Sequence, residues 1–195
     1  MNTTYRKVID RIAARTLTLT EKNREKLSAC LERFEWAKND LLLREGQVCK
    51  YIWFVDQGMI RLFYNKRGKD LTEHFAYEEG IFLSLESFFR QIPSRLIIEA
   101  LEPTVVYGLG YEKLHGLMET EPEIEHFYCK ILENCLILSQ QKADACRFET
   151  AGERYHRLLQ EHPEVVKRAP LIHIASHLGM SPELSLIHIS EPTRP

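Results

Sequence analysis

The chain has 195 residues, of which 44% are hydrophobic and 28% are charged, and its formal net charge is −2. This length allows one ordinary core and a small second domain. Proteins that coat nucleic acid non-specifically are usually basic overall, so the near-neutral charge confines any DNA binding to a local basic surface. No apolar run approaches the roughly 20 residues of a membrane helix, and the N-terminus lacks a signal-peptide pattern, so we expect a cytoplasmic protein without a membrane partner.

The first part of the chain predicts two helices. The stretch from Tyr5 to about Ala14 has a helical pattern, and Thr18 followed by Glu21 fits a capping box at the start of a second helix. The apolar residues that follow recur at helical spacing, so the second helix is expected to include all of them. They are Leu27, Cys30, Leu31 and Phe34.

The period then changes to that of β-strands. Gly58 lies between two apolar segments, where a turn favours the positive φ that glycine tolerates. Regularly spaced short strands are typical of an antiparallel barrel or sandwich. The expected strands are Leu41–Leu43, Tyr51–Val55, Met59–Tyr64, Leu71–Tyr77, Arg95–Leu101 and Thr104–Leu109.

The second half of the chain predicts helices. A short one covers Tyr111–Thr120, and Pro122 suits the first turn of a much longer one. The apolar stripe of this long helix is too extensive for a solvated helix, so part of it should cover the β-structure and the rest should form a homodimer. The stripe comprises Ile124, Phe127, Ile131, Cys135 and Leu138.

The C-terminal segment resembles two helices joined by a sharp turn. Thr150–Glu161 and Leu171–Leu178 are expected to be helical, and Pro163 and Pro170 to bracket a connection between them. Gly179 permits a sharp turn after the second of these helices. A further helix is expected to begin at Ser181, which is a good N-cap residue.

Taken in this order, four segments resemble the catabolite-activator and fumarate–nitrate-regulator (Crp/Fnr) family. They are Tyr51–Leu62 (YIWFVDQGMIRL), Glu99–Val106 (EALEPTVV), the long helix after Pro122, and Leu171–Glu183 (LIHIASHLGMSPE). The resemblance implies an α+β fold in which a cyclic-nucleotide-binding-like antiparallel β-roll with flanking helices (1–120) precedes a dimerisation helix (121–148). A winged helix-turn-helix (149–183) would follow, cut short before its recognition helix is complete.

The ligand pocket that the resemblance implies departs from the family pattern. The family uses a Gly-Glu pair and an Arg followed by Ser or Thr to hold a cyclic nucleotide, whereas this chain aligns Leu83-Ser84 and Ser94 there, with Arg95 one residue late. Neighbouring strand residues point to opposite faces, so the slip turns the guanidinium away. We therefore expect cyclic AMP to bind weakly and the effector to be another small molecule. The candidate pocket residues are Ser84, Glu86, Ser94 and Arg95. Alternatively, Ser84 and Glu86, with Ser87, suit the cap of a short helix, and Arg95 suits a solvated position unless a local bulge turns it back to the pocket.

The candidate DNA contacts are Lys167, Arg168 and Ser181, and the first two are equally compatible with ordinary solvated charges.

The tail from Leu184 to Arg194 (LSLIHISEPTR) reproduces, residue for residue, the translation of a transposon-based sequencing-library adaptor. We expect 184–195 not to be native and therefore exclude it from the fold. In a helix-turn-helix the second helix reads the bases, and here only Pro182 and Glu183 follow its expected start at Ser181. The chain as written is therefore expected not to bind operator DNA specifically.

These patterns predict a ligand-responsive DNA-binding transcription regulator, and the alternative is a cyclic-nucleotide-type regulatory module of a signalling enzyme. No nucleophile–base set, paired-carboxylate motif or P-loop suggests that the chain is itself an enzyme. His173 and His177 are spaced like metal ligands but lack a Glu or Cys partner nearby. The cysteines form no CxxC pair, so neither a metal nor a cofactor is expected. They are Cys30, Cys49, Cys129, Cys135 and Cys146.

Overall fold

The computed structural model describes residues 9–10 and 19–180. Most of the first expected helix, Thr18, Ser181 and the tail from 184 to 195 therefore lie outside the described residues. The helices are α2 (Glu21–Cys30), α3 (Leu85–Arg90), α4 (Tyr111–Met118), α5 (Pro122–Phe148), α6 (Ala151–Glu161), α7 (Pro163–Arg168) and α8 (Leu171–Leu178). The strands are β1 (Leu31–Trp36), β2 (Leu41–Leu43), β3 (Tyr51–Gln57), β4 (Ile60–Lys66), β5 (Lys69–Ala76), β6 (Ile81–Phe82), β7 (Ile97–Ala100) and β8 (Thr104–Gly110).

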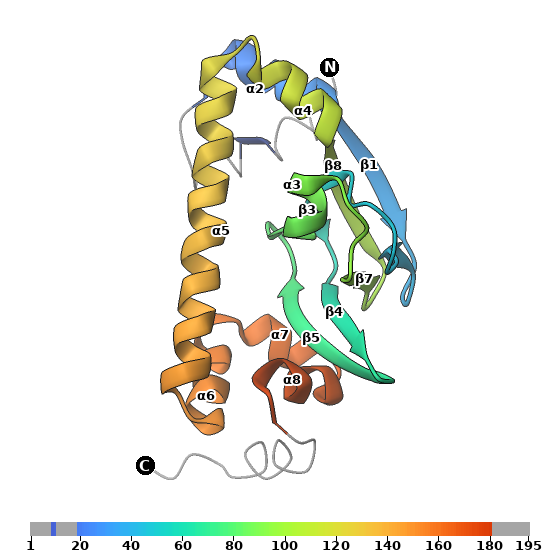
Figure 1. The fold of residues 1–195 in the computed structure, drawn as a ribbon, viewed down its shortest axis with the longest axis vertical. Coiled ribbons are helices and arrows are strands. Elements are labelled where there is room, and N and C mark those ends of the chain that lie inside the picture. The colour runs from blue at the N-terminus through green and yellow to red at the C-terminus, as the bar shows by residue number, and fades with distance from the viewer. Residues whose placement is uncertain (1–8, 11–18, 181–195) are drawn as a thin grey trace.

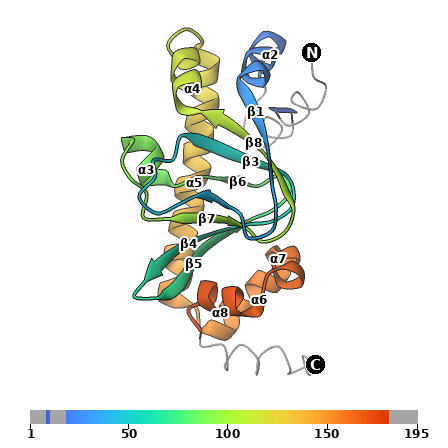
Figure 2. The same ribbon diagram turned by 90° about the vertical axis from the view of Figure 1, so that its right-hand side faces the viewer.

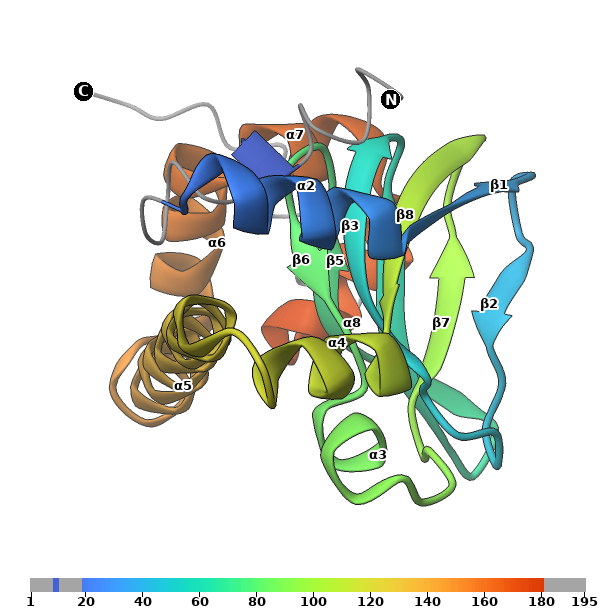
Figure 3. The same ribbon diagram turned by 90° about the horizontal axis from the view of Figure 1, so that it is seen from above.

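The strands form two four-stranded antiparallel sheets, which confirms the α+β class and the β-roll. One sheet has the order β1-β8-β3-β6 and the other β2-β7-β4-β5. The two sheets face each other, and α5 stands beside them (Figure 3). The larger apolar core lies inside the roll and includes Ile52, Phe54, Phe82, Ile98 and Tyr107.

Gly58 connects β3 to β4 and adopts the positive φ that its place in the sequence suggests, at +100°. A Cβ atom at this position would overlap the Thr104 side chain and lie 2.8 Å from the carbonyl oxygen of Pro103. Glycine is therefore required both by the backbone conformation and by the close approach of the β7–β8 turn.

The long helix α5 runs along one side of the molecule from the α2–α4 end to the α6–α8 end (Figure 1). Its first half packs on the roll, since Ile124, Phe127 and Ile131 are buried in the same core as the strands. These three predicted dimer-helix residues are thus unavailable to a partner. Further along the helix, Leu136 and Leu138 are 72% and 61% exposed.

The expected extension of the second helix through Leu31 and Phe34 is wrong. The helix ends at Cys30, and Leu31–Trp36 forms β1, which pairs with β8 from Leu31↔Leu109 to Trp36↔Thr104. Leu31 and Phe34 fit a helical period by coincidence, while the exposed Arg33 and Glu35 reveal the alternation of a strand.

The capping box expected at Thr18 and Glu21 does not start α2. Thr20 occupies the N-cap position without a side-chain cap, because its backbone N–H and hydroxyl instead donate to the Glu123 carboxylate at 2.8 and 2.6 Å. A capping box does form at α6, between Thr150 and Glu153. The true signal was present in the sequence at Thr150, three residues before a glutamate.

The C-terminal helices build a second, smaller core beneath the β4–β5 hairpin (Figure 2). Part of the connection expected between Pro163 and Pro170 is in fact the short helix α7, with Pro163 in its first turn. Helix α8 ends where predicted: Gly179 has φ +66°, Gly179 N–H donates to Ser176 O, and Met180 N–H donates to Ala175 O. This is the Schellman pattern that closes a helix before a change of direction.

Within the described ranges, no helix combines the length and apolar character needed to cross a membrane.

Candidate functional site

A cavity of about 320 Å³ lies between the roll, α3 and α5. All four predicted pocket residues, Ser84, Glu86, Ser94 and Arg95, line it. The sequence interpretation missed the wall that β5 and α5 contribute. That wall consists of Glu73, His74, Cys135, Leu138, Ser139 and Lys142. Two residues predicted for the dimer interface, Cys135 and Leu138, therefore face this cavity.

Ser84 and Ser94 form a buried hydroxyl pair in the cavity wall, with 2.9 Å between their Oγ atoms. The Ser94 hydroxyl also donates to the carbonyl of Leu96 and accepts from its N–H, each at 2.9 Å. Because the Ser94 proton is used there, Ser84 donates to Ser94 and keeps acceptor capacity of its own. Ser84 stands at the N-cap position of α3 but makes no side-chain cap there, which corrects the capping interpretation for this residue.

Arg95 lies at the mouth of the cavity rather than inside it. Its side chain is 79% exposed, and its nearest ionic partner is Glu86 at 3.7 Å. The adjacent Ser94 is 3% exposed, so the two residues take opposite environments, although both precede β7, which begins at Ile97 and not at Arg95 as expected. Glu86 also pairs with Arg90 at 3.2 Å and is half-exposed.

A β-bulge shapes the opposite wall. The register between β4 and β5 shifts so that Leu62 faces His74 and Phe63 faces Thr72, which leaves Glu73 without a ladder partner. Lys142 of α5 donates to the Glu73 backbone carbonyl and lies 2.6 Å from its carboxylate. The bulge therefore binds α5 to the roll at the edge of the cavity.

His74 is uncharged at neutral pH. The side chain is exposed to solvent at the cavity, but the surrounding protein atoms, with the nearby Lys142 ammonium adding to their effect, lower the pKa of the imidazole to about 4. The cavity wall therefore contains one close ion pair, Glu73–Lys142, while Glu86 at the mouth lies 3.2 Å from Arg90 and 3.7 Å from Arg95.

On the other side of β5, helix α8 docks against the edge of the roll. The Ser176 hydroxyl accepts from Thr72 N–H at 2.9 Å and donates to Asp70 O at 2.8 Å, so it satisfies the outer edge of the strand. Nearby, the buried Arg61 pairs with Glu99 at 2.7 Å and donates to His173 Nδ1 at 2.7 Å. Burial, with Arg61 adding to it, lowers the pKa of His173.

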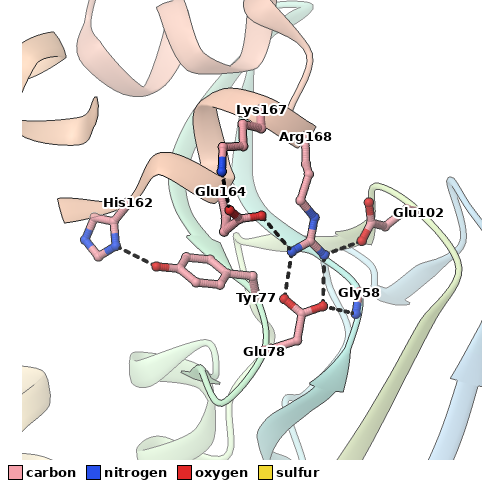
Figure 4. Close-up of polar contacts among 8 residues, drawn as sticks. All are labelled: Gly58, Tyr77, Glu78, Glu102, His162, Glu164, Lys167 and Arg168. Carbon is pink, nitrogen blue, oxygen red and sulfur yellow. Dashed lines mark hydrogen bonds and ion pairs between the residues drawn. The ribbon is translucent and has the colours of Figure 1, made fainter. Parts of the chain in front are cut away.

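The predicted DNA contact Arg168 is occupied within the protein (Figure 4). Its guanidinium binds both oxygens of Glu78, at 2.7 and 3.0 Å, and also pairs with Glu102. Glu78 in turn accepts the N–H of Gly58 at 2.9 Å. Arg168 therefore links α7 to the turns of the roll, and a DNA phosphate would have to compete with these two carboxylates.

Lys167, the neighbouring candidate, differs from Arg168. Its side chain is 68% exposed and pairs with Glu164, one turn earlier, at 2.8 Å. Such an exposed pair contributes little and exchanges readily with solvent. Lys167 thus remains accessible to a phosphate, while Ser181 lies outside the described residues.

The roll and its flanking helix are similar to parts of known proteins. Residues 33–121 match the cyclic nucleotide-binding domain. This match includes α3, α4 and all of the strands, apart from the first two residues of β1. The chain matches no curated protein sequence.

Solved structures share the fold of the cyclic nucleotide-binding domain and of the helices that follow it. CLP of Xanthomonas campestris, described as a c-di-GMP-responsive global regulator, has a TM-score of 0.68 at 16% identity, covering 87% of this chain and 90% of its own. FixK2 of Bradyrhizobium japonicum has a TM-score of 0.70 at 17% identity, with coverages of 82% and 83%. The catabolite activator protein of Thermus thermophilus has a TM-score of 0.58 at 17% identity, with coverages of 92% and 84%. At these identities the likeness shows the fold alone.

Proposed function

We propose that this protein is a ligand-responsive, DNA-binding transcription regulator whose effector occupies the cavity between the roll and α5. The observation that carries this proposal is the position of β5. On one side its bulge at Glu73 holds α5 through Lys142, and on the other its edge holds α8 through Ser176. One strand thus joins the cavity wall to the helix that would support DNA recognition.

The proposed route of response follows from these contacts. In this proposal, a ligand that binds beside His74 and Lys142 changes the balance between two arrangements. In one, β5 is bonded to both α5 and α8, and in the other these bonds are broken. A ligand shifts such an equilibrium only through different affinities for the two arrangements. The two contacts of β5 suit this role because both are weak. The contact with α8 is made by the single Ser176 hydroxyl, and the contact with α5 includes the partly exposed Glu73–Lys142 ion pair.

The DNA-binding part of the proposal rests on α8 and its cap. In a helix-turn-helix, a sharp turn follows the first helix, and a second helix enters the major groove. The glycine cap at Gly179 provides such a turn, and Ser181 would begin the second helix. We propose the division into a sensor domain (1–120), a dimerisation helix (121–148) and a DNA-binding segment (149–183) on this basis.

The alternative, a regulatory module of a signalling enzyme, has less support. Helices α6–α8 build a core of their own against the β4–β5 hairpin, around residues such as Tyr155, Ile174 and Leu178. Such a core is expected of a second functional domain. The solved structures described above as a global regulator and an activator cover 87% and 92% of this chain, which is more than the cyclic nucleotide-binding match at 33–121 alone.

The experiment begins by re-amplifying the gene from source DNA and sequencing past codon 183. We expect the adaptor-like codons for Leu184–Arg194 to be replaced by a helix with polar and basic residues and by a wing. The full-length protein should then select discrete genomic fragments and shift them in gels at nanomolar concentration, with an affinity that falls steeply with salt. The 195-residue chain, used as the control, should give no sequence-selective shift.

Two outcomes would contradict the proposal. If untagged genomic DNA contains the same LSLIHI codons, the tail is native and the expected recognition helix is absent. If the full-length protein selects no sequence from the genomic fragments, the DNA-binding function is wrong, whatever the cavity binds.

A further inference from the structure

The geometry points to the chemical class of the effector: an uncharged, mainly apolar small molecule that carries a hydrogen-bond donor for Ser84. This inference rests on the proposed function, because it assumes that the cavity beside α5 is the effector site.

The wall is mostly apolar. About half of its residues have aliphatic, aromatic or thiol side chains, contributed by β4, β6, α3, the β7 approach and α5. They are Leu62, Ile81, Phe82, Leu83, Leu85, Pro93, Leu96, Cys135 and Leu138. A cavity of about 320 Å³ with such a wall and a few convergent polar groups is typical of a small-molecule site.

The charges on the wall are already compensated. Lys142 lies 2.6 Å from Glu73, and Arg95 lies 3.7 Å from Glu86. Inside the cavity, an anionic ligand would gain a strong charge-assisted bond only by separating Lys142 from Glu73, because the exposed Arg95 lies at the mouth. It would then leave a carboxylate beside its own negative charge, which is unfavourable in a partly desolvated site. A neutral ligand leaves both pairs intact.

Leu83 and Ser84 remove the alternative of a phosphate cradle. Leu83 fills space with a side chain that is 7% exposed, and the Ser84 hydroxyl is bonded to Ser94 at 2.9 Å. Since Ser84 donates to Ser94, its remaining lone pairs accept hydrogen bonds. A hydroxyl or N–H group on an apolar ligand is the complement of this acceptor.

The test uses N-phenyl-1-naphthylamine, an uncharged fluorescent probe with a single N–H donor. Its emission should rise on mixing with the 195-residue chain, with a micromolar dissociation constant. Ser139 lines the cavity on α5 and is exposed to solvent, so Ser139→Phe should place an aromatic ring in the cavity and weaken probe binding at least tenfold. Asn134→Phe, at an exposed position of the same helix outside the cavity wall, is the matched control and should not change it.

Competition tests the role of Ser84. The donor 1-naphthol should displace the probe about fivefold better than 1-methoxynaphthalene, which has the same rings without the donor, since one neutral hydrogen bond has about this effect. In Ser84→Ala the two competitors should become equal. Should the preference persist in this variant, Ser84 is not the acceptor and the inference fails.

Cyclic AMP and inorganic phosphate test whether a charged ligand competes with the probe for the cavity. Neither should displace the probe at millimolar concentration, and calorimetry should show no sub-micromolar binding of cyclic AMP. Sub-micromolar binding of cyclic AMP would overturn the neutral-ligand inference and leave the proposed regulator function standing. Absence of probe binding, or equal binding in Ser139→Phe, would also overturn it, whereas failure of the full-length protein to select DNA would overturn the function alone.

Discussion

Arg168 is the residue whose role changes most between sequence and structure. Its guanidinium bridges Glu78 and Glu102 on two turns of the roll, and hydrogen bonds to these carboxylates raise its pKa. Arg168→Ala leaves both carboxylates without their cation. We expect a loss of about 2 kcal/mol in unfolding free energy, since hydrogen bonds to charged groups contribute about 1.5–3 kcal/mol.

Thermal unfolding measures this prediction, and the midpoint should fall by about 4–8 °C for a chain of this size. Lys167→Ala is the control, because Lys167 is adjacent but 68% exposed, and its midpoint should stay nearly unchanged. Equal effects of the two substitutions would mean that the Arg168 contacts do not hold α7 to the roll.

His177 makes the docking of α8 sensitive to acid. Its ring meets Phe75 edge-on, and its Nδ1 is buried without a hydrogen-bond partner. Burial, with Lys142 and His74 adding to it, lowers the pKa of His177 to about 3, despite backbone contacts at Thr72 and Glu73 that raise it. The unfolded chain has a pKa near 6.5, so this stabilising contribution is complete above pH 6.5 and is lost as the pH falls toward 3.

By pH 5 the loss attributable to His177 should be about 2 kcal/mol, because the unfolded chain has taken up the proton and the folded chain has not. Urea unfolding at pH 7.5 and pH 5 measures it. In His177→Leu the difference between the two pH values should shrink by about this amount, while His74 and His173 still contribute. An unchanged difference would refute the assignment of the acid sensitivity to His177.

At the scale of elements, local patterns predicted most of the strands but not the contacts between distant segments. The strands were recognisable because apolar segments alternate with turns such as the one at Gly58. The strand β1 was missed because Leu31 and Phe34 also fit a helical period, and its pairing with β8 is visible only in three dimensions. Likewise, Ser84 was predicted as a cavity residue because the family resemblance aligns it with a ligand-binding position. Lys142 was missed because it lies 69 positions from its partner Glu73 and no local pattern connects them.

The edge of β5 depends on a single side chain of α8. Ser176 takes the place of a neighbouring strand, since its hydroxyl bonds both Thr72 N–H and Asp70 O. Ser176→Ala should cost about 1 kcal/mol and leave these two backbone groups without that partner. Hydrogen exchange should quicken about fivefold at the Thr72 amide and along α8, with β1 and β8 unchanged.

Ser139→Ala is the control for this substitution, because Ser139 is exposed on α5 and is not part of the α8 contact. It should leave exchange at Thr72 as in the parent protein. A uniform change over all strands in Ser176→Ala would indicate general destabilisation rather than release of α8.

For the whole molecule, the long helix α5 has two functions along its length. Its first half belongs to the core of its own roll, through residues such as Phe127. Beside the cavity-lining Cys135 and Leu138, it exposes apolar side chains that the described residues of the same chain leave uncovered. Leu136 is 72% exposed and Ile137 is 54% exposed, next to each other on the helix. Exposed contiguous apolar groups of this kind mark interaction surfaces, and closed twofold dimers are the commonest soluble homo-oligomers.

We therefore predict a homodimer through this part of α5, formed by residues other than the buried Ile124, Phe127 and Ile131. Each large apolar side chain that becomes buried contributes roughly 1.5–3 kcal/mol, so two from each chain sustain a micromolar association. Light scattering of the full-length protein at micromolar concentration should give the mass of a dimer. Leu136→Glu combined with Ile137→Glu should give a folded monomer, while Ile172→Glu, at a residue that is 61% exposed on α8, should leave the dimer intact. A parent protein that stays monomeric at this concentration, or a dimer that survives both glutamates, would contradict an interface on α5.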